Sequence, residues 1–229
     1  MDLLKNRVGS TTSYTSLAND LQVSVHTVKY CSVCTHQGAP MVDYYQYHHT
    51  TYHEKTFHID PSSFLEPLIR HLKPGDKLLD VGCGSGRDIL WLKGHGFNVT
   101  GFERSKGLAA LARKHTGCEI IEGDFQTYDF SKQKFDAILL SGSLVHIPHA
   151  HLESVFGHIL DGVGNGGKVL VSLKEGDGSS VGEDGRAFFY WQDTELRNLF
   201  AKHIFRVLEF HKGTSKVNKS DIWLSYVLA

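Results

Sequence analysis

The 229-residue sequence has few cysteines, almost no net charge and no long apolar run, and each shortage excludes a class of protein. Four cysteines are too few and too scattered for a disulfide framework, so a reducing cytoplasm is the expected compartment. A formal net charge of −1 provides no general attraction to nucleic acid or to a membrane surface. An apolar run of about 18 residues is absent, and the first residues lack a secretory signal, so no membrane-spanning helix is expected.

Stretches typical of strands and helices alternate from about Met41 onward, whereas residues 1–40 are polar and rich in Ser and Thr. This alternation predicts an α/β fold, with a mostly parallel sheet covered by helices on both faces. The expected strands cover 77–82, 97–103, 118–124, 135–142, 167–174, 205–212 and 221–229. No helix separates the last two strands, so one of them is expected to run antiparallel. Ser105 and Asp193 are the expected N-caps of the helices that they begin.

A glycine-rich loop follows the first expected strand, in "LLDVGCGSGRD" at residues 78–88. Glycines allow a backbone to approach a ligand closely, and such loops hold nucleotide-like cofactors at the carboxyl ends of parallel strands. The spacing of Gly82, Gly84 and Gly86 is G-x-G-x-G, whereas a dinucleotide site requires G-x-G-x-x-G. Arg87 occupies the position of the third dinucleotide glycine, which argues against a nicotinamide or flavin cofactor.

Two carboxylates follow the next two strands. Glu103 ends "NVTGFE", where a carboxylate accepts hydrogen bonds from both hydroxyls of a ribose. Asp124 and Phe125 follow the third strand in "IEGDF", where an acid beside an aromatic ring suits an adenine.

These motifs together resemble the class I S-adenosylmethionine-dependent methyltransferases over roughly residues 60–229. The resemblance also includes "VTGFERS", "FDAILLSGSLVHI" and "GNGGKVLVSLK", all in register with the expected strands. It implies a Rossmann-like seven-stranded sheet whose last strand is antiparallel, with S-adenosylmethionine as cofactor and S-adenosylhomocysteine as product. The methionyl part would lie over residues 82–86 and the ribose on Glu103, with the adenine at Asp124 and Phe125. Asp80 would help to hold the methionyl amino group.

The resemblance gives a set of residues that would contact the cofactor. They are Asp80, Gly82, Cys83, Gly84, Gly86, Arg87, Glu103, Arg104, Gly123, Asp124, Phe125, Ser141 and Gly142.

The acceptor class is indicated by the sequence after the fourth strand. "SGSLVHIP" is neither the Asn/Asp-Pro-Pro-aromatic motif of amine and amide methyltransferases nor the Pro-Cys pair of the RNA cytosine-5 enzymes. It looks like the small-molecule branch of the family, with an O, N or S atom as acceptor. A sulfonium is already a strong electrophile, so alignment is the main requirement and a catalytic triad is not needed. His146 is the candidate base, and a purely structural role is the alternative.

A polar loop, residues 172–196, is expected after the fifth strand and is expected to shape the acceptor pocket. Lys174 and Arg186 would bind an anionic acceptor, and Phe188 and Tyr190 would form its walls. In the alternative, the aromatic side chains enter the core and the charges are merely solvated. "GRD" at the helix start also resembles tellurite and thiol methyltransferases, which keeps a chalcogen acceptor open. Arg87 would then contact the cofactor carboxylate, or would simply be an exposed residue.

Residues 43–60 are expected to fold over the cofactor as a lid, as in related enzymes. The candidate contacts to cofactor or acceptor are Tyr44, Tyr45, Tyr47, His48 and His53, of which Tyr45 and His53 are assigned to the substrate. The sequence does not distinguish which tyrosine makes the contact, and an aromatic helix packed on the sheet is the alternative. Cys31, Cys34, His48 and His53 come near the spacing of a zinc finger. The intervening residues lack its apolar anchors, and no metal is expected.

The segment 13–30 resembles a helix-turn-helix without its supporting helix or wing. Residues 1–40 are therefore interpreted as an extension, vestigial or upstream of a working start at Met41, and residues 41–229 as the methyltransferase domain. A small-molecule methyltransferase, monomeric or homodimeric, is the first hypothesis, and neither nucleic acid nor membrane is an expected partner. An RNA or protein methyltransferase and a DNA-binding regulator with a cofactor-sensing domain are the alternatives.

Overall fold

A computed structural model describes residues 42–229, and the expectations for residues 1–40, including the helix-turn-helix and Cys31 and Cys34, fall outside these described residues. A seven-stranded sheet lies at the centre, in the order β3-β2-β1-β4-β5-β9-β8. Its strands are β1 Lys77–Val81, β2 Asn98–Glu103, β3 Ile120–Glu122, β4 Phe135–Ser141, β5 Val163–Lys174, β8 Val207–Thr214 and β9 Ile222–Leu228. Strands β1 to β5 pair in parallel, and β9 lies antiparallel between β5 and β8. The expected seven strands and the antiparallel last strand are confirmed.

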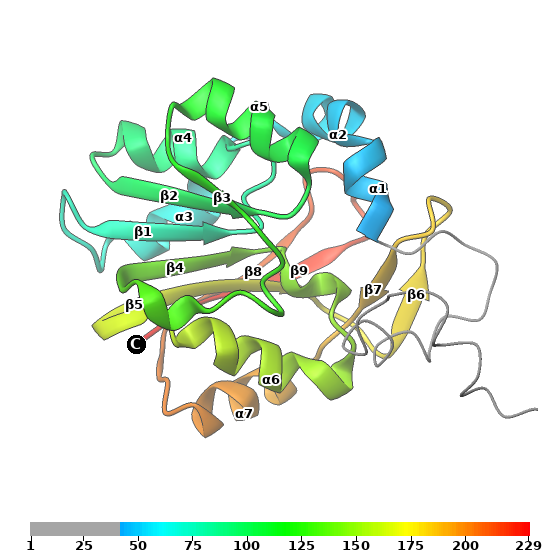
Figure 1. Ribbon diagram of the computed structural model, residues 1–229. Helices are drawn as coiled ribbons and strands as arrows, with labels where there is room; N and C mark the ends of the chain where they lie inside the picture. Colours follow the sequence, from blue (N-terminus) through cyan, green and yellow to red (C-terminus); the bar gives the residue numbers. More distant parts are fainter. Residues whose placement is uncertain (1–41) are drawn as a thin grey trace, which may run out of the picture. The chain divides into compact units, whose positions relative to one another are not determined.

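Helices cover both faces of this sheet (Figure 1). One face carries α3 Ser62–Ile69, α4 Arg87–Gly94 and α5 Lys106–Thr116, and the other carries α6 His149–Leu160 and α7 Asp193–Lys202. Each face of the sheet has its own hydrophobic core, and successive strand residues pack into opposite cores. Leu78 packs with Leu65 and Ile89 on one face, whereas Leu79 packs with Phe156 and Leu152 on the other. The continuous apolar strands therefore reflect burial on both sides. No helix in the described residues combines the length and apolar character needed to cross a membrane.

Three short elements gather beyond the carboxyl ends of the strands (Figure 1). Helices α1 Val42–Tyr47 and α2 His49–Thr56 lie on one side, and the hairpin of β6 Ser179–Val181 and β7 Ala187–Phe189 lies on the other. The short 3-10 turn η2, Leu144–His146, follows β4 at the same end, whereas the turn η1, Phe130–Lys132, precedes β4.

Two local expectations need correction. The segment after β5 was expected to be a loop, but it contains the β6–β7 hairpin, whose turn is closed by Gly182 N–H donating to the Arg186 carbonyl at 2.8 Å. Asp193 was expected to cap α7, but the N-cap is Gln192, whose backbone N–H donates to Glu195 at 2.8 Å. Asp193 instead accepts hydrogen bonds from Arg197 and Tyr226, which are supplied by the same helix and by β9. The expected N-cap Ser105 is confirmed, since its hydroxyl accepts from Leu108 N–H.

Candidate active site

The glycine loop turns sharply from β1 into α4, and its three glycines all have positive φ, at 78°, 58° and 89° for Gly82, Gly84 and Gly86. A Cβ on Gly82 would lie 2.6 Å from the Cβ of Ser143, and one on Gly86 would lie 2.7 Å from Thr116 Cγ2. Because other residues rarely adopt this backbone conformation and no space exists for a side chain, glycine is required at both positions. The loop thus exposes backbone at the carboxyl edge of the sheet.

Glu103 is fixed beside this loop at the end of β2. Its side chain is buried, and its two carboxylate oxygens accept backbone hydrogen bonds from Gly84 at 3.0 Å and from Ser105 at 2.8 Å. Burial raises the pKa of Glu103, although these backbone donors act in the opposite direction. Each carboxylate oxygen has a further lone pair. Glu103 therefore has acceptor capacity for a pair of ribose hydroxyls.

Asp80 lies at the end of β1, beneath the loop, and is 2% exposed. Its Oδ2 atom and the hydroxyl of Ser143 are buried with no hydrogen-bond partner among the described residues. Burial, together with the negative charge of Asp88, raises the pKa of Asp80 well above its ordinary value. An unsatisfied buried carboxylate oxygen is costly and is characteristic of a group that pairs with a ligand.

At the expected adenine site, Asp124 forms an ion pair with Arg104, the residue that follows Glu103 of the expected ribose site. Arg104 Nη1 lies 3.1 Å from Asp124 Oδ2, while Asp124 Oδ1 accepts the backbone N–H of Gln126. Phe125 is half-buried and packs against the core. A Cβ on Gly123 would lie 2.9 Å from the ring of Phe102. Asp124 thus already has a cationic partner beside the position where an adenine is expected.

The side chain of Arg87 interacts with three neighbouring residues, Asp88, Thr56 and Phe64. Its guanidinium bonds Asp88 at 2.6 Å, donates to the Thr56 carbonyl at 3.5 Å and lies 5.5 Å from the ring centroid of Phe64. It is therefore not a solvated helix residue, since it ties the start of α4 to the end of α2. Its contact with a cofactor carboxylate remains a prediction.

The helices α1 and α2 cover the glycine loop. The ring of Tyr52 lies 3.7 Å from the position of a Cβ on Gly84, and His53 Nδ1 lies 2.9 Å from the hydroxyl of Ser85. The imidazole of His53 also stacks on His115 of α5, with ring centroids 4.7 Å apart. Burial, followed by the charges of His115 and His58, lowers the pKa of His53.

Helix α1 is held to the start of α5 by two hydrogen bonds. Ser105 Oγ donates to the Tyr45 carbonyl at 2.9 Å, and the backbone N–H of Lys106 donates to Gln46 at 3.0 Å. The segment expected to form a lid thus packs on α5 and the glycine loop rather than on a face of the sheet. We refer to α1 and α2 as the lid.

His146 lies on the far side of the loop, in η2. Its Nδ1 atom is 2.6 Å from the Ala187 carbonyl, and its Nε2 atom is 2.8 Å from the hydroxyl of Tyr45. Burial is the main cause that lowers the pKa of His146 to about 4, with the charges of Arg186 and Lys174 acting in the same direction. The imidazole is therefore neutral at neutral pH.

The two cations near His146 already have acidic partners. Lys174 is 7% exposed, and its Nζ lies 2.8 Å from Asp221 and 3.9 Å from the ring centroid of Phe188. Arg186 bonds Asp184 at 2.7 Å. These pairs neutralise the positive charge that an anionic acceptor would require.

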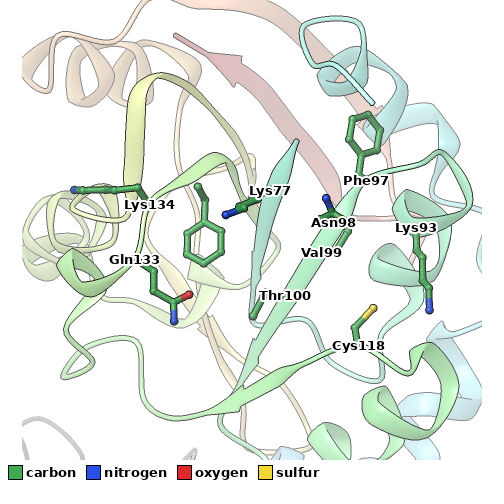
Figure 2. Close-up of a pocket in the computed structure, with 10 residues that line it drawn as sticks. Lys77, Lys93, Phe97, Asn98, Val99, Thr100, Cys118, Gln133 and Lys134 are labelled. Atoms are coloured by element: carbon green, nitrogen blue, oxygen red, sulfur yellow. The ribbon is translucent and has the colours of Figure 1, made fainter. Parts of the chain in front are cut away.

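A separate hollow of about 620 Å³ lies at the opposite end of the strands (Figure 2). Lys77, Asn98 and Phe135, which begin β1, β2 and β4, line it. Lys93 and Asn98 already donate to the Thr116 and Gly75 carbonyls. It lies away from the glycine loop, which follows the carboxyl end of β1.

Residues 78–167 match a family model described as "Methyltransferase domain". 24-Methylenesterol C-methyltransferase 2 of Oryza sativa subsp. japonica is 34% identical over 38% of this chain and 26% of that protein. Phosphoethanolamine N-methyltransferase 1 of Zea mays is 34% identical over 48% of this chain and 22% of that protein. The chain thus matches only about a quarter of the length of these relatives.

Solved structures share the fold at low identity. PH0226 protein from Pyrococcus horikoshii OT3 has a TM-score of 0.62 at 21% identity, covering 80% of this chain and 97% of that chain. Magnesium protoporphyrin IX methyltransferase from Synechocystis PCC 6803, solved with bound S-adenosylmethionine, has a TM-score of 0.62 at 14% identity, covering 84% of this chain and 99% of that chain. Residues 78–167 are thus similar to a methyltransferase domain, and the fold is shared with a solved methyltransferase.

The structure brings together five residues that the sequence proposed for catalysis or substrate binding: Tyr45, His146, Lys174, Arg186 and Phe188. Two proposed residues lie elsewhere. His53 contacts the glycine loop at Ser85, and Tyr190 bonds Ser180 within the hairpin. Ser141 and Gly142 end β4, where Gly142 N–H donates to Ser172 of β5. Cys83 is buried in the loop, and burial raises its pKa well above the ordinary value.

Several residues at this site were not predicted from the sequence. Tyr52, whose ring lies 3.7 Å from the position of a Cβ on Gly84, belongs to no motif, and Ser143, which leaves no room for a Cβ on Gly82, lies within "SGSLVHIP" but was given no role there. No motif in the sequence indicates that Asp221 pairs with Lys174 or that Asp184 pairs with Arg186. Only the aromatic richness of residues 43–60 signalled that a ring there would contact the loop.

Proposed function

We propose that this chain is an S-adenosylmethionine-dependent methyltransferase that acts on a small molecule. The observation that carries the proposal is the arrangement of two buried carboxylates, Asp80 and Glu103, beside a glycine loop that has no room for a Cβ at Gly82 or Gly86. The residues fit the cofactor, because Asp80 has an unsatisfied oxygen for an ammonium group and Glu103 has free acceptor capacity for ribose hydroxyls.

The cofactor, when bound, supplies an electrophilic methyl group on a sulfonium. The chain's own residues would hold it through Asp80, the loop backbone from Gly82 to Gly86, and Glu103. The lid would exclude water, because Tyr52 and His53 cover the loop at Gly84 and Ser85. Arg104 and Asp124 would lie at the adenine end.

The acceptor would enter beyond the carboxyl ends of β4 and β5. His146 follows β4, Lys174 ends β5, and Phe188 lies against both, with ring centroids of His146 and Phe188 4.8 Å apart. These side chains form a partly aromatic site with one neutral imidazole. The curated relatives named above are described by their names as methyltransferases of a sterol and of phosphoethanolamine, both small molecules.

Isothermal titration of the purified full chain with S-adenosylmethionine tests this proposal. We expect micromolar binding, and we expect Glu103→Ala to weaken it at least 10-fold, because a hydrogen bond to a charged group contributes about 1.5–3 kcal/mol. Glu119→Ala is the matched control, since Glu119 is exposed just before β3. Circular dichroism checks that each variant is folded.

Absence of binding by the folded wild-type chain would contradict the proposal. Equal loss of affinity in the Glu103→Ala and Glu119→Ala variants would contradict the assigned role of Glu103.

A further inference from the structure

Three polar groups form one hydrogen-bonded chain across the acceptor side of the site. Arg186 Nη1 lies 3.2 Å from the Tyr45 hydroxyl, that hydroxyl lies 2.8 Å from His146 Nε2, and His146 Nδ1 lies 2.6 Å from the Ala187 carbonyl. Tyr45 comes from the lid, His146 from η2, and Arg186 from the hairpin.

Elementary bonding rules fix the direction of each of these hydrogen bonds. The Ala187 carbonyl only accepts, so His146 Nδ1 carries the hydrogen, and a neutral imidazole then has a lone pair on Nε2. The Tyr45 hydroxyl must therefore donate to Nε2. Arg186 only donates, so it donates to the Tyr45 oxygen. That oxygen retains one lone pair.

Burial and the surrounding positive charges keep His146 neutral. The charges of Arg186 in the hairpin, Lys174 in β5 and Arg104 in the loop between β2 and α5 act on it, and the Tyr45 hydroxyl contacts it from the lid. All three cations disfavour an imidazolium, and burial has the largest effect, so the pKa of His146 is lowered to about 4. The lone pair on His146 Nε2 is thus present at neutral pH, but it already accepts a hydrogen bond from the Tyr45 hydroxyl.

The position of Tyr45 is set by the lid. Its carbonyl accepts from Ser105 Oγ, and its ring lies edge-on against Tyr44 and Tyr52, with centroids 5.2 Å and 5.1 Å apart. The Tyr44 ring in turn lies 4.3 Å from the guanidinium carbon of Arg186. The hydroxyl is therefore held between its two partners, His146 and Arg186.

We propose, on the basis of the function proposed above, that Tyr45 is a catalytic proton relay between the acceptor and His146, and that the acceptor is a phenol. A proton on the acceptor has no direct path to His146 Nε2 while Tyr45 donates to it. The free lone pair of the Tyr45 oxygen is the group that an acceptor hydroxyl meets.

The acceptor O–H bond breaks and its proton passes to the Tyr45 oxygen, while the proton of Tyr45 passes to His146 Nε2 and forms an imidazolium. With S-adenosylmethionine bound, the electron pair of the acceptor oxygen would form the new O–CH₃ bond, and the pair of the breaking C–S bond would stay on sulfur. Arg186 stabilises the negative charge that develops on the Tyr45 oxygen. The imidazolium later releases its proton to water.

Proton affinity favours an acceptor that keeps its proton at neutral pH, and a phenol, with an ordinary pKa near 10, is such an acceptor. Burial raises the pKa of Tyr45 above its ordinary value, so the Tyr45 oxygen, once it has passed its own proton to His146, holds the proton of a phenol at least as strongly as the phenol does. A carboxylate or an oxyanion of tellurium has already lost its proton and requires no relay. The rings of Tyr44, Tyr52 and Phe188 pack around Tyr45 and Arg186, so the surroundings of the Tyr45 hydroxyl are aromatic, as a phenol acceptor requires.

The test compares Tyr45→Phe with Tyr47→Phe, because Tyr47 lies on the same helix but is 73% exposed. Isothermal titration with S-adenosylmethionine first establishes that both full-length variants bind the cofactor as the wild type does. With phenol as the probe acceptor at pH 7.5, we expect Tyr45→Phe to lower kcat about 100-fold, the contribution typical of proton transfer catalysis. With 4-nitrophenol at pH 9, where the probe is already ionised, we expect a change of less than about threefold.

A second readout does not depend on turnover. Nitrogen-15 NMR of His146 in the wild-type chain should show a neutral imidazole with hydrogen on Nδ1 and a hydrogen-bonded Nε2. Tyr45→Phe should shift only the Nε2 resonance, and Tyr47→Phe should shift neither.

Each other outcome overturns a specific part of the proposal. An unchanged kcat of Tyr45→Phe with phenol, or hydrogen on Nε2 of His146, would refute the relay. Cofactor binding without turnover of phenol or 4-nitrophenol would refute the phenol assignment while leaving the proposed function intact. Failure of the wild-type chain to bind the cofactor would refute the proposed function and the relay with it.

Discussion

Replacement of Gly86 by alanine should destabilise the protein by two separable effects. Its φ of 89° is in the left-handed region, where an alanine costs about 1–2 kcal/mol. The new Cβ would also lie 2.7 Å from Thr116 Cγ2 and 3.2 Å from Ala112 Cα, and overpacking of this kind costs about 1–3 kcal/mol. We therefore expect Gly86→Ala to lower the free energy of unfolding by about 2–5 kcal/mol.

Gly75 offers a matched control for the backbone effect. Its φ is 90°, and a Cβ there would meet nothing within 4 Å, so Gly75→Ala should cost only about 1–2 kcal/mol. The difference between the two variants isolates the steric contribution. Thr116→Ser removes the methyl group that the new Cβ would meet, so Gly86→Ala should cost about 1 kcal/mol less in that background.

Urea unfolding followed by tryptophan fluorescence measures these differences, since Trp91, Trp191 and Trp223 are distributed over the fold. Equal destabilisation by Gly86→Ala and Gly75→Ala would refute the close packing of the glycine loop against α5. An unchanged cost of Gly86→Ala in the Thr116→Ser background would show that Thr116 is not the residue it meets.

Two further predictions concern stability. The folded-state pKa of His146, about 4, is below its ordinary value of 6.5, so below pH 6.5 the unfolded chain binds a proton that the folded protein does not. Stability should therefore fall between pH 6.5 and pH 4 by at most about 3 kcal/mol from this group, and urea unfolding of His146→Gln should lack that contribution. The same slope in wild type and variant would contradict the burial of His146, because the raised pKa values of Asp80 and Glu103 act on both proteins alike. Tyr226→Phe should cost about 1.5 kcal/mol, because the buried hydroxyl of Tyr226 donates to Asp193 at 2.7 Å. A loss below about 0.5 kcal/mol in urea unfolding would refute that contribution.

Most of the sheet was predictable from the sequence because its strands are apolar on both faces and are separated by helices of regular periodicity. Ser105 was correctly predicted as an N-cap, because its side chain acts on a helix that begins at the next residue. Asp193 was not an N-cap, because Tyr226 of β9 and Arg197 engage its carboxylate. The hairpin after β5 was missed, since its strands are three residues each and its turn signals equally suit a loop.

The sequence by itself determined the glycine loop and the carboxylate at the end of β2, because local spacing carries both. The two lie together because adjacent parallel strands end at the same edge of a sheet. Only the tertiary structure decided which lid tyrosine faces His146 and which acids neutralise the cations. Tyr45 is 101 residues from His146 and 141 residues from Arg186 along the chain, and no local pattern records such contacts. They arise because the folded sheet brings the lid, η2 and the hairpin into contact beyond the carboxyl ends of its strands. Figure 1 shows the lid helices and the hairpin at this end of the sheet.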